Sequence, residues 1–106
     1  MRRRLGGPDR LTPRAARALA HGLLLAEGFE TVARGARSGS LYLRAPGGPH
    51  QVRIADHART PKRRRQYPDV VTSLVIAAPL SEAGVRARVA AALRAVAAAR
   101  PPDQPV

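Results

Sequence analysis

Apolar residues near the start of the chain recur at the spacing of a helix. The residues on this stripe are Ala16, Ala20, Leu23 and Leu24. Thr12 offers a hydroxyl that can cap the helix, and Pro13 stands at the first helical position, where its missing N–H costs nothing. Gly28 provides a C-terminal stop. We therefore predict a helix that begins after Thr12 and ends before Gly28.

Further along the chain, apolar and polar residues alternate, which is the pattern of half-buried strands. The alternating segments are 40–44 and 51–54, and a weaker candidate covers 30–34. Between the two clear strands lies Pro46-Gly47-Gly48-Pro49, whose glycines can supply the positive φ of a tight hairpin turn. Alternation would place Leu41, Leu43, Val52 and Ile54 on one face of this hairpin. The open face would then present Tyr42, Arg44 and Arg53.

The second half of the chain predicts a long loop, a buried strand and a second helix. Residues 55–69 contain a run of four cations, and loops of this length are usually functional or disordered. Residues 70–76 are rich in β-branched and apolar side chains, as in a buried strand. Ser81 can cap a helix with Glu82 in its first turn, and Pro101 ends that helix. The apolar stripe of this helix consists of Val85, Val89, Leu93 and Val96.

These elements give the order α-β-β-β-α and one α+β domain over residues 11–99. We expect a three- to four-stranded antiparallel sheet with two helices packed on one face, because each strand hides one side and shows the other. Residues 1–10 are basic and contain glycine and proline, so we interpret them as a flexible arm. Residues 100–106 are expected to form a disordered tail.

The charge of the chain points to a polyanionic partner. Its 19 basic and 7 acidic residues give a formal net charge of +12, which favours RNA or DNA. Cysteine is absent, which removes disulfides, thiolate catalysis and the usual zinc ligands and fits a reducing compartment. No apolar stretch reaches the length needed to span a bilayer, and no apolar signal segment follows the first arginines. We therefore expect a cytoplasmic protein without membrane association, metal or cofactor.

The candidate nucleic-acid-binding residues fall into three groups. On the sheet face, a ring can stack on a base and guanidinium groups can contact phosphate. In the loop, a run of cations can follow a phosphate backbone. The candidates are Tyr42, Arg44 and Arg53 on the sheet face, Arg59, Lys62, Arg63, Arg64 and Arg65 in the loop, and Arg86 and Arg94 on the second helix. For the sheet face and the loop, solvated charges without a binding role are the alternative interpretation.

His57 is the candidate catalytic residue. It has Asp56 beside it and follows a strand where the basic loop begins. A histidine there could act as general acid or base in phosphodiester cleavage, with Arg53 or Arg59 stabilising the developing phosphorane charge. Spacing identifies no second catalytic partner, so a loop or cap histidine is the alternative. The sequence contains no glycine-rich phosphate loop, dinucleotide fingerprint or His/Glu pair at metal-ligand spacing.

Short motifs between residues 15 and 57 follow a recognisable order. They are Leu25-Ala26-Glu27-Gly28-Phe29-Glu30, Gly39-Ser40 before an alternating strand, Pro46-Gly47-Gly48, and a strand ending in Asp56-His57. This order resembles the HicA family of toxin mRNA interferases, which implies a double-stranded-RNA-binding-domain-like α-β-β-β-α fold and ribonuclease activity. The family's catalytic histidine after Gly-Ser is Leu41 here, and the proline of its Pro-x-His is Ala55. The residues that carry over are Gly28, Phe29, Gly39, Ser40 and His57.

Three functions follow from these patterns. Our main hypothesis is a small basic protein that binds nucleic acid, chiefly by arginine contacts with the phosphate backbone. One alternative is a HicA-like ribonuclease that uses His57. The other is a phage or mobile-element protein with a protein partner, which inhibits a nucleic-acid-binding complex by occupying its groove with a cationic face. The main hypothesis requires the arginines to gather on one side of the fold.

Overall fold

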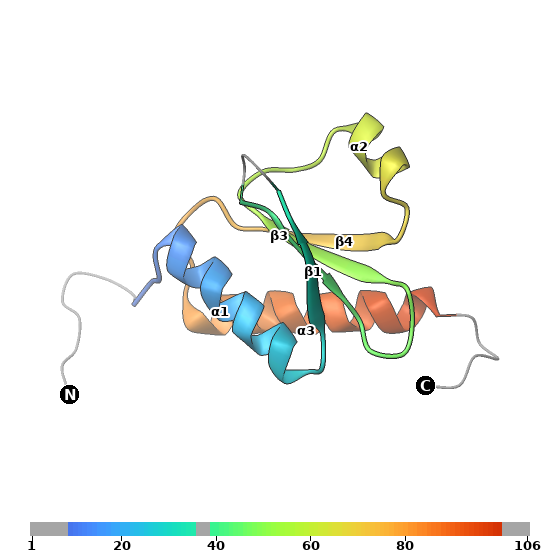
Figure 1. Ribbon diagram of the computed structural model, residues 1–106. Coiled ribbons are helices and arrows are strands. Elements are labelled where there is room, and N and C mark those ends of the chain that lie inside the picture. The colour runs from blue at the N-terminus through green and yellow to red at the C-terminus, as the bar shows by residue number, and fades with distance from the viewer. Residues whose placement is uncertain (1–8, 36–38, 101–106) are drawn as a thin grey trace.

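The structure of the protein is a computed structural model that describes residues 9–35 and 39–100. Within these residues three helices and four strands follow one another (Figure 1). They are α1 (Pro13–Ala26), β1 (Glu30–Arg34), β2 (Leu41–Arg44), β3 (Gln51–Ala55), α2 (Pro61–Gln66), β4 (Val70–Val75) and α3 (Glu82–Ala99). No helix in this part of the chain has both the length and the apolar character needed to cross a membrane. The expected arm and tail lie outside the described residues, apart from Asp9, Arg10 and Arg100.

The four strands form one mixed sheet in the order β1-β2-β3-β4. β2 pairs antiparallel with both β1 and β3, whereas β3 and β4 pair in parallel. The α+β class is confirmed, but the expectation of a wholly antiparallel sheet is wrong at β4. The reason is the connection through residues 56–69, which contains α2. A chain that returns to begin a parallel neighbour needs about a dozen residues or more, usually including a helix.

β4 occupies an edge of the sheet and is less buried than its sequence indicates. Within the strand only Val70 and Leu74 are buried, and the other four residues are half-buried. The expectation of a buried strand over residues 70–76 is therefore met only in part, at Val70, Leu74 and Ile76, because β4 has a neighbouring strand on one side only.

α1 and α3 pack against each other on one face of the sheet, and α2 lies on the opposite face (Figure 1). The hydrophobic core fills the space between the two long helices and the sheet. Its members include Ala16, Ala20 and Leu24 of α1, Leu43, Val52, Ile54 and Leu74 of the sheet, and Val85, Val89, Ala92 and Val96 of α3. Phe29 is the only aromatic residue of this cluster among the described residues, so aliphatic contacts supply the packing. The predicted apolar faces of both helices and of the hairpin are confirmed.

The two long helices begin at the predicted caps. Thr12 Oγ1 accepts a hydrogen bond from a backbone N–H in the first turn of α1 at 3.1 Å, and Ser81 Oγ does the same for α3 at 3.0 Å. Two backbone hydrogen bonds join these starts: the Leu11 N–H donates to Leu80 O at 2.8 Å, and the Leu80 N–H donates to Leu11 O at 3.1 Å. The residues that precede α1 and α3 are therefore joined by a pair of backbone hydrogen bonds.

β2 and β3 form the predicted hairpin, in which Tyr42 lies opposite Arg53. Gly47 in the turn has a φ of 78°, a left-handed value that glycine adopts without strain. Arg100 donates from Nη2 to Pro46 O in the same turn at 2.7 Å. This side chain, which the sequence analysis placed at the start of the tail, therefore links the end of α3 to the hairpin turn.

Residues 55–69, expected to form a loop, contain the short helix α2. Thr60 caps this helix, with Oγ1 accepting a hydrogen bond from the Arg63 N–H at 3.2 Å, and Pro61 stands in its first turn. Every residue of α2 is exposed. The loop expectation is therefore wrong at α2. The reason is that a proline followed by five polar residues carries no apolar stripe by which a helix is recognised.

Candidate functional site

A groove lies between the outer face of the sheet and the segment that carries α2. Its volume is about 910 Å³, within the range of sites that bind small ligands. The sheet lines it with the polar residues Arg34, Ser40, Tyr42, Gln51 and Arg53, and the covering segment lines it with His57, Arg59, Thr60, Arg63 and Tyr67. The groove thus brings together residues that the sequence analysis placed on a sheet face, in a loop and at a possible catalytic position.

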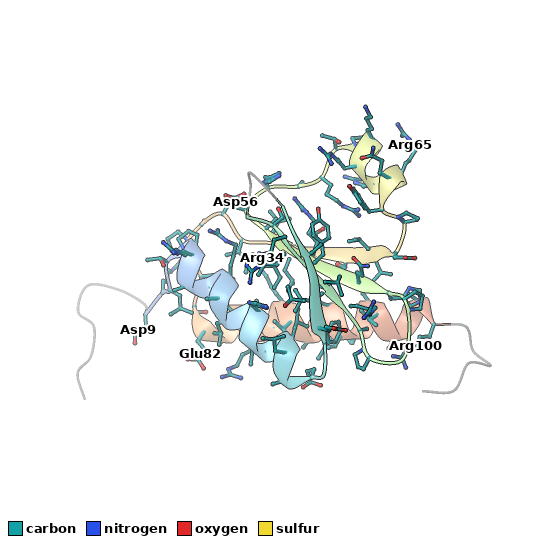
Figure 2. The ribbon with its side chains drawn as sticks, viewed as in Figure 1. Asp9, Arg34, Asp56, Arg65, Glu82 and Arg100 are labelled. Carbon is teal, nitrogen blue, oxygen red and sulfur yellow. The ribbon has the colours of Figure 1, made fainter. Side chains whose placement is uncertain are left out.

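The charged side chains of the groove are predominantly arginines. Arg34 comes from the end of β1 and Arg53 from β3, while Arg59 and Arg63 come from the covering segment. Among the described residues no aspartate or glutamate lines the groove. The exposed cations of α2 lie beside it, and Figure 2 shows Arg65 pointing outward from that helix. This distribution of charge favours an anionic ligand.

Arg53 is buried beneath the covering segment, with 2% of its surface exposed. Its Nη1 donates to His57 O at 2.9 Å, and its Nη2 lies 3.3 Å from His57 Nε2. Its Nε is buried and has no hydrogen-bond partner among the described residues. The expectation that Arg53 stands on an open sheet face is therefore wrong. Strand alternation assigned its face correctly, but residues 57–67 cover that face.

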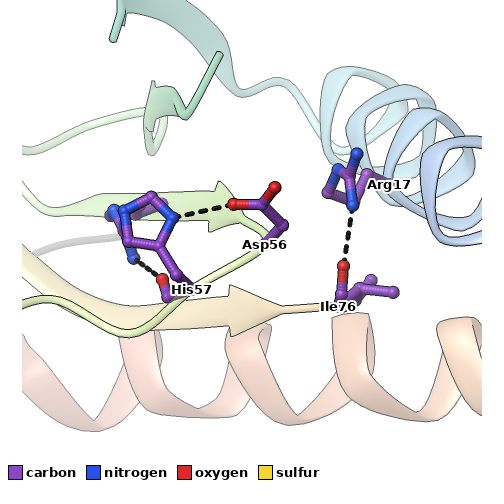
Figure 3. A network of polar contacts seen from close by, with 5 residues as sticks. Arg17, Asp56, His57 and Ile76 are labelled. Carbon is purple, nitrogen blue, oxygen red and sulfur yellow. Dashed lines mark hydrogen bonds and ion pairs between the residues drawn. The ribbon is translucent and has the colours of Figure 1, made fainter. Parts of the chain in front are cut away.

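His57 is held between Arg53 and its neighbour Asp56. The His57 Nδ1 and the Asp56 Oδ1 are 2.7 Å apart. A dashed line marks this contact in Figure 3. Because a guanidinium group only donates hydrogen bonds, the contact with Arg53 assigns the lone pair to Nε2 and the proton to Nδ1, which donates to Asp56. The lone pair that a general base would use is thus directed at Arg53.

Asp56 is the acidic residue closest in sequence to the groove, and its charge is already compensated. The hydrogen bond from His57 lowers the pKa of Asp56, and the positive charge of Arg17 contributes further. Arg17 itself donates from Nη1 to Ile76 O at 2.8 Å, on the side of Asp56 away from His57 (Figure 3). Asp56 therefore orients His57, and Asp56 itself is not among the residues that line the groove.

Two tyrosines from opposite walls meet in the groove. The ring centroids of Tyr42, from β2, and Tyr67, at the end of α2, are 6.1 Å apart, with an angle of 41° between the planes. Such a tilted pair is a favourable aromatic contact. Arg59 Nη1 donates a hydrogen bond to Tyr67 O at 3.3 Å, which links the residues before and after α2. α2 buries no residue of its own, so these contacts are what hold it over the sheet.

Arg59 experiences an environment that opposes its positive charge. Burial lowers the pKa of Arg59, and the nearby charge of Arg53 lowers it further. Arginine nevertheless stays protonated at physiological pH. The two guanidinium groups therefore repel each other inside the groove, and an anion bound beside them would reduce this repulsion.

The remaining predicted residues lie apart from the groove. Arg44 forms an ion pair with Glu30 at 2.7 Å, and Arg86 forms one with Glu82 at 2.9 Å. Arg86 and Arg94 are exposed on α3, on the other face of the sheet from α2 (Figure 1). The expectation that all these cations share one surface is wrong for Arg86 and Arg94, because the apolar stripe of α3 packs on the inner face of the sheet.

The sequence analysis left Arg34, Thr60 and Tyr67 out of the site. Thr60-Pro61 repeats the arrangement of Thr12-Pro13, and this repeat could have revealed the start of α2. Tyr67 follows the basic run with only Gln66 between them, and an aromatic residue beside cations is typical of nucleic-acid-binding surfaces. Arg34 ends a strand without any distinguishing neighbour, so no local signal identifies it.

Comparisons of the chain with protein-family models, curated proteins and solved structures gave no match. Within residues 9–35 and 39–100, no three His, Asp or Glu side chains are arranged to hold a metal ion. The shape and charge of the groove are therefore the features that indicate its ligand.

Proposed function

We propose that the protein binds nucleic acid in the groove between the sheet and α2, mainly through contacts of arginines with phosphates. The observation that carries this proposal is a groove of about 910 Å³ lined by four arginines and, among the described residues, by no acidic side chain. Guanidinium groups present several donors in a planar fork, which suits the oxygens of a phosphate. The formal net charge of +12 supports the same class of partner.

The exposed cations of α2 fit this function as an entry surface. Lys62, Arg64 and Arg65 are exposed on α2, the helix that also carries the groove-lining Arg63, but they do not line the groove themselves. Charges of this kind raise the rate of encounter with a polyanion, and salt screens them within about 8 to 10 Å. The lining arginines then make the contacts that last. Affinity should consequently fall as the salt concentration rises, because binding releases counterions from the nucleic acid.

A ribonuclease function is less favoured by the same geometry. The His57 Nε2 that would accept a proton is 3.3 Å from a guanidinium nitrogen of Arg53, a donor that competes for the same lone pair. The Asp56–His57 hydrogen bond orients the imidazole but supplies no second acid or base aimed into the groove. We therefore assign His57 to holding Arg53 in place rather than to cleavage.

The test compares two double variants of equal charge. Arg59→Ala with Arg63→Ala removes two cations from the groove, and Arg86→Ala with Arg94→Ala removes two from α3. Binding of labelled RNA and DNA is measured by fluorescence anisotropy over a salt series. We expect the groove variant to bind more weakly and to flatten the slope of log K against log salt by about 1.4, or roughly 0.7 for each lost contact with a single strand. The α3 variant should keep nearly the full slope.

Two results would contradict the proposal. Equal losses in both double variants would mean that overall charge, not the groove, drives binding. If the wild-type protein binds neither RNA nor DNA at low salt, the proposed function is wrong. Running the same samples on a denaturing gel shows whether labelled RNA stays intact, and cleavage that depends on His57 would restore the enzyme hypothesis.

A further inference from the structure

The floor of the groove contains a buried cation that lacks an acidic partner. Arg53 is 2% exposed, its Nε has no hydrogen-bond partner, and it makes no ion pair with a carboxylate among the described residues. A buried charge without a counter-charge is costly for a folded protein. Arg59 adds a second positive charge nearby: burial lowers the pKa of Arg59, and the charge of Arg53 lowers it further. Arg53 therefore lacks an anionic partner with several acceptor oxygens, and a phosphate is such an anion.

A phosphate can reach Arg53 only by entering the groove. The covering segment from His57 to Tyr67 lies over this side chain, and the exposed cations of α2 stand further out. A nucleic-acid backbone that ran along the outside of α2 would contact those outer cations and leave Arg53 untouched. The strand that satisfies Arg53 must pass between the sheet and α2.

The aromatic residues of the groove are placed to contact a base at the same time. The rings of Tyr42 and Tyr67 are in contact at a centroid distance of 6.1 Å, so no base fits between them. Tyr67 nevertheless keeps 45% of its surface exposed, whereas Tyr42 is half-buried and supports it from the sheet. Stacking on Tyr67 requires a base whose flat face is free. In a double helix those faces are covered by the neighbouring base pairs, but in a single strand they are accessible.

From these observations we infer that the groove takes single-stranded nucleic acid, with one phosphate on Arg53 and Arg59 and an unpaired base stacked on Tyr67. The inference rests on the proposed function and specifies its ligand. Duplex RNA or DNA should not use this site, because neighbouring base pairs cover the base faces that would stack on Tyr67. A duplex can contact only the outer cations of α2.

The first experiment compares one oligonucleotide as a single strand and as a duplex with its complement. Anisotropy titrations at low salt are made with wild type, Tyr67→Ala and the control Tyr67→Phe, which keeps the ring. Wild type should bind the single strand more tightly than the duplex. Tyr67→Ala should weaken single-strand binding roughly 5- to 150-fold, the range measured for one base stacked on an aromatic side chain. Tyr67→Phe should retain most of the affinity, and duplex binding should be the same in all three proteins.

The second experiment tests the phosphate position with inorganic phosphate as the probe. A ligand that binds only the folded state raises the melting temperature. Phosphate should therefore raise the melting temperature of wild type by more than that of Arg53→Met, at equal ionic strength. General salting effects of phosphate act on both proteins and cancel in the comparison. If Arg53→Met does not fold, Arg59→Met, at a half-buried position, is measured in its place.

The outcomes separate this inference from the function on which it rests. Duplex bound as tightly as the single strand, or Tyr67→Ala indistinguishable from wild type, would overturn the inference and leave nucleic-acid binding in place. The same phosphate response in wild type and in the arginine variant would overturn the phosphate position. If wild type binds neither form at low salt, the proposed function fails together with the inference.

Discussion

His21 connects α1 to β1, and its protonation is coupled to folding. Its Nε2 lies 2.8 Å from Thr31 Oγ1, within hydrogen-bond distance. Burial lowers the pKa of His21 below its ordinary value of 6.5, and the positive charge of Arg34 lowers it further. The folded protein therefore holds this histidine in its uncharged form at a pH where the unfolded chain already binds a proton.

This shift predicts a loss of stability in mild acid. Because the unfolded chain binds more protons just below pH 6.5, the contribution of His21 is complete above that pH and declines as the pH falls toward the lower pKa of the folded state. We expect wild type to lose more unfolding free energy than His21→Gln between about pH 7.5 and about pH 5.5. Urea denaturation at both pH values measures the difference. Glutamine can still bond to Thr31, and identical pH dependence in the two proteins would contradict the assignment.

Arg53 shows where single-residue reasoning from sequence stops. Alternation along 51–54 correctly placed it on the same side of the hairpin as Tyr42. Alternation says nothing of what covers that side, because the cover comes from residues 57–67 and depends on tertiary contacts. The face of each hairpin residue was therefore predictable, but the burial of Arg53 and the groove above it were not.

Two helices of the protein begin with the same pair of residues. Thr12-Pro13 opens α1 and Thr60-Pro61 opens α2, and in both cases the threonine hydroxyl accepts a backbone hydrogen bond. The two helices differ in what supports them. α1 has 14 residues and buries Ala16, Ala20 and Leu24, whereas α2 has six residues and buries none. A helix as short as α2 is not stable by itself, so its cap and its contacts with the groove decide whether it forms.

Removing the two caps should therefore have different effects. Thr12→Ala should lower the free energy of unfolding by about 1 kcal/mol, because α1 is part of the core. Thr60→Ala should change global stability much less, since α2 can loosen while the rest stays folded. Hydrogen exchange over residues 60–67 should instead accelerate, with weaker binding in the groove. If Thr60→Ala destabilises the whole protein as much as Thr12→Ala does, α2 is more firmly joined to the core than its exposure indicates.

At this scale the sequence predicted the elements that carry a cap and an apolar stripe. α1 and α3 have both signals, and the hairpin has alternation with a glycine-containing turn. α2 has a cap but no stripe, and its four cations resemble a solvated loop. The direction of β4 was also beyond reach, because strand composition indicates burial and not orientation.

The whole molecule depends on one thin core between α1, α3 and the sheet. The cluster contains a single aromatic ring, Phe29, among the described residues. Its centre includes fully buried aliphatic side chains, among them Leu24, Leu43 and Val52. With so few large side chains, each of them carries a considerable share of the packing. The groove lies on the other side of the sheet and adds little to this core.

A core truncation should accordingly remove a large part of the total stability. Leu43→Ala is expected to cost about 2 to 5 kcal/mol, against about 5 to 15 kcal/mol for a typical domain. Leu25→Ala is the matched control, because Leu25 is 46% exposed and its truncation should change stability by no more than about 0.5 kcal/mol. Denaturant unfolding followed by circular dichroism measures both. A Leu43→Ala loss as small as that of Leu25→Ala would mean that the core is not where we place it.

Residues 56–69 both carry the cations of α2 and let β4 run in the same direction as β3. A hairpin of about two to five residues in their place could only return β4 in the reverse direction. Shortening the connection to such a turn would thus change the pairing of β3 and β4 from parallel to antiparallel. The length of this segment is therefore a condition of the sheet topology, even though every residue of α2 is exposed.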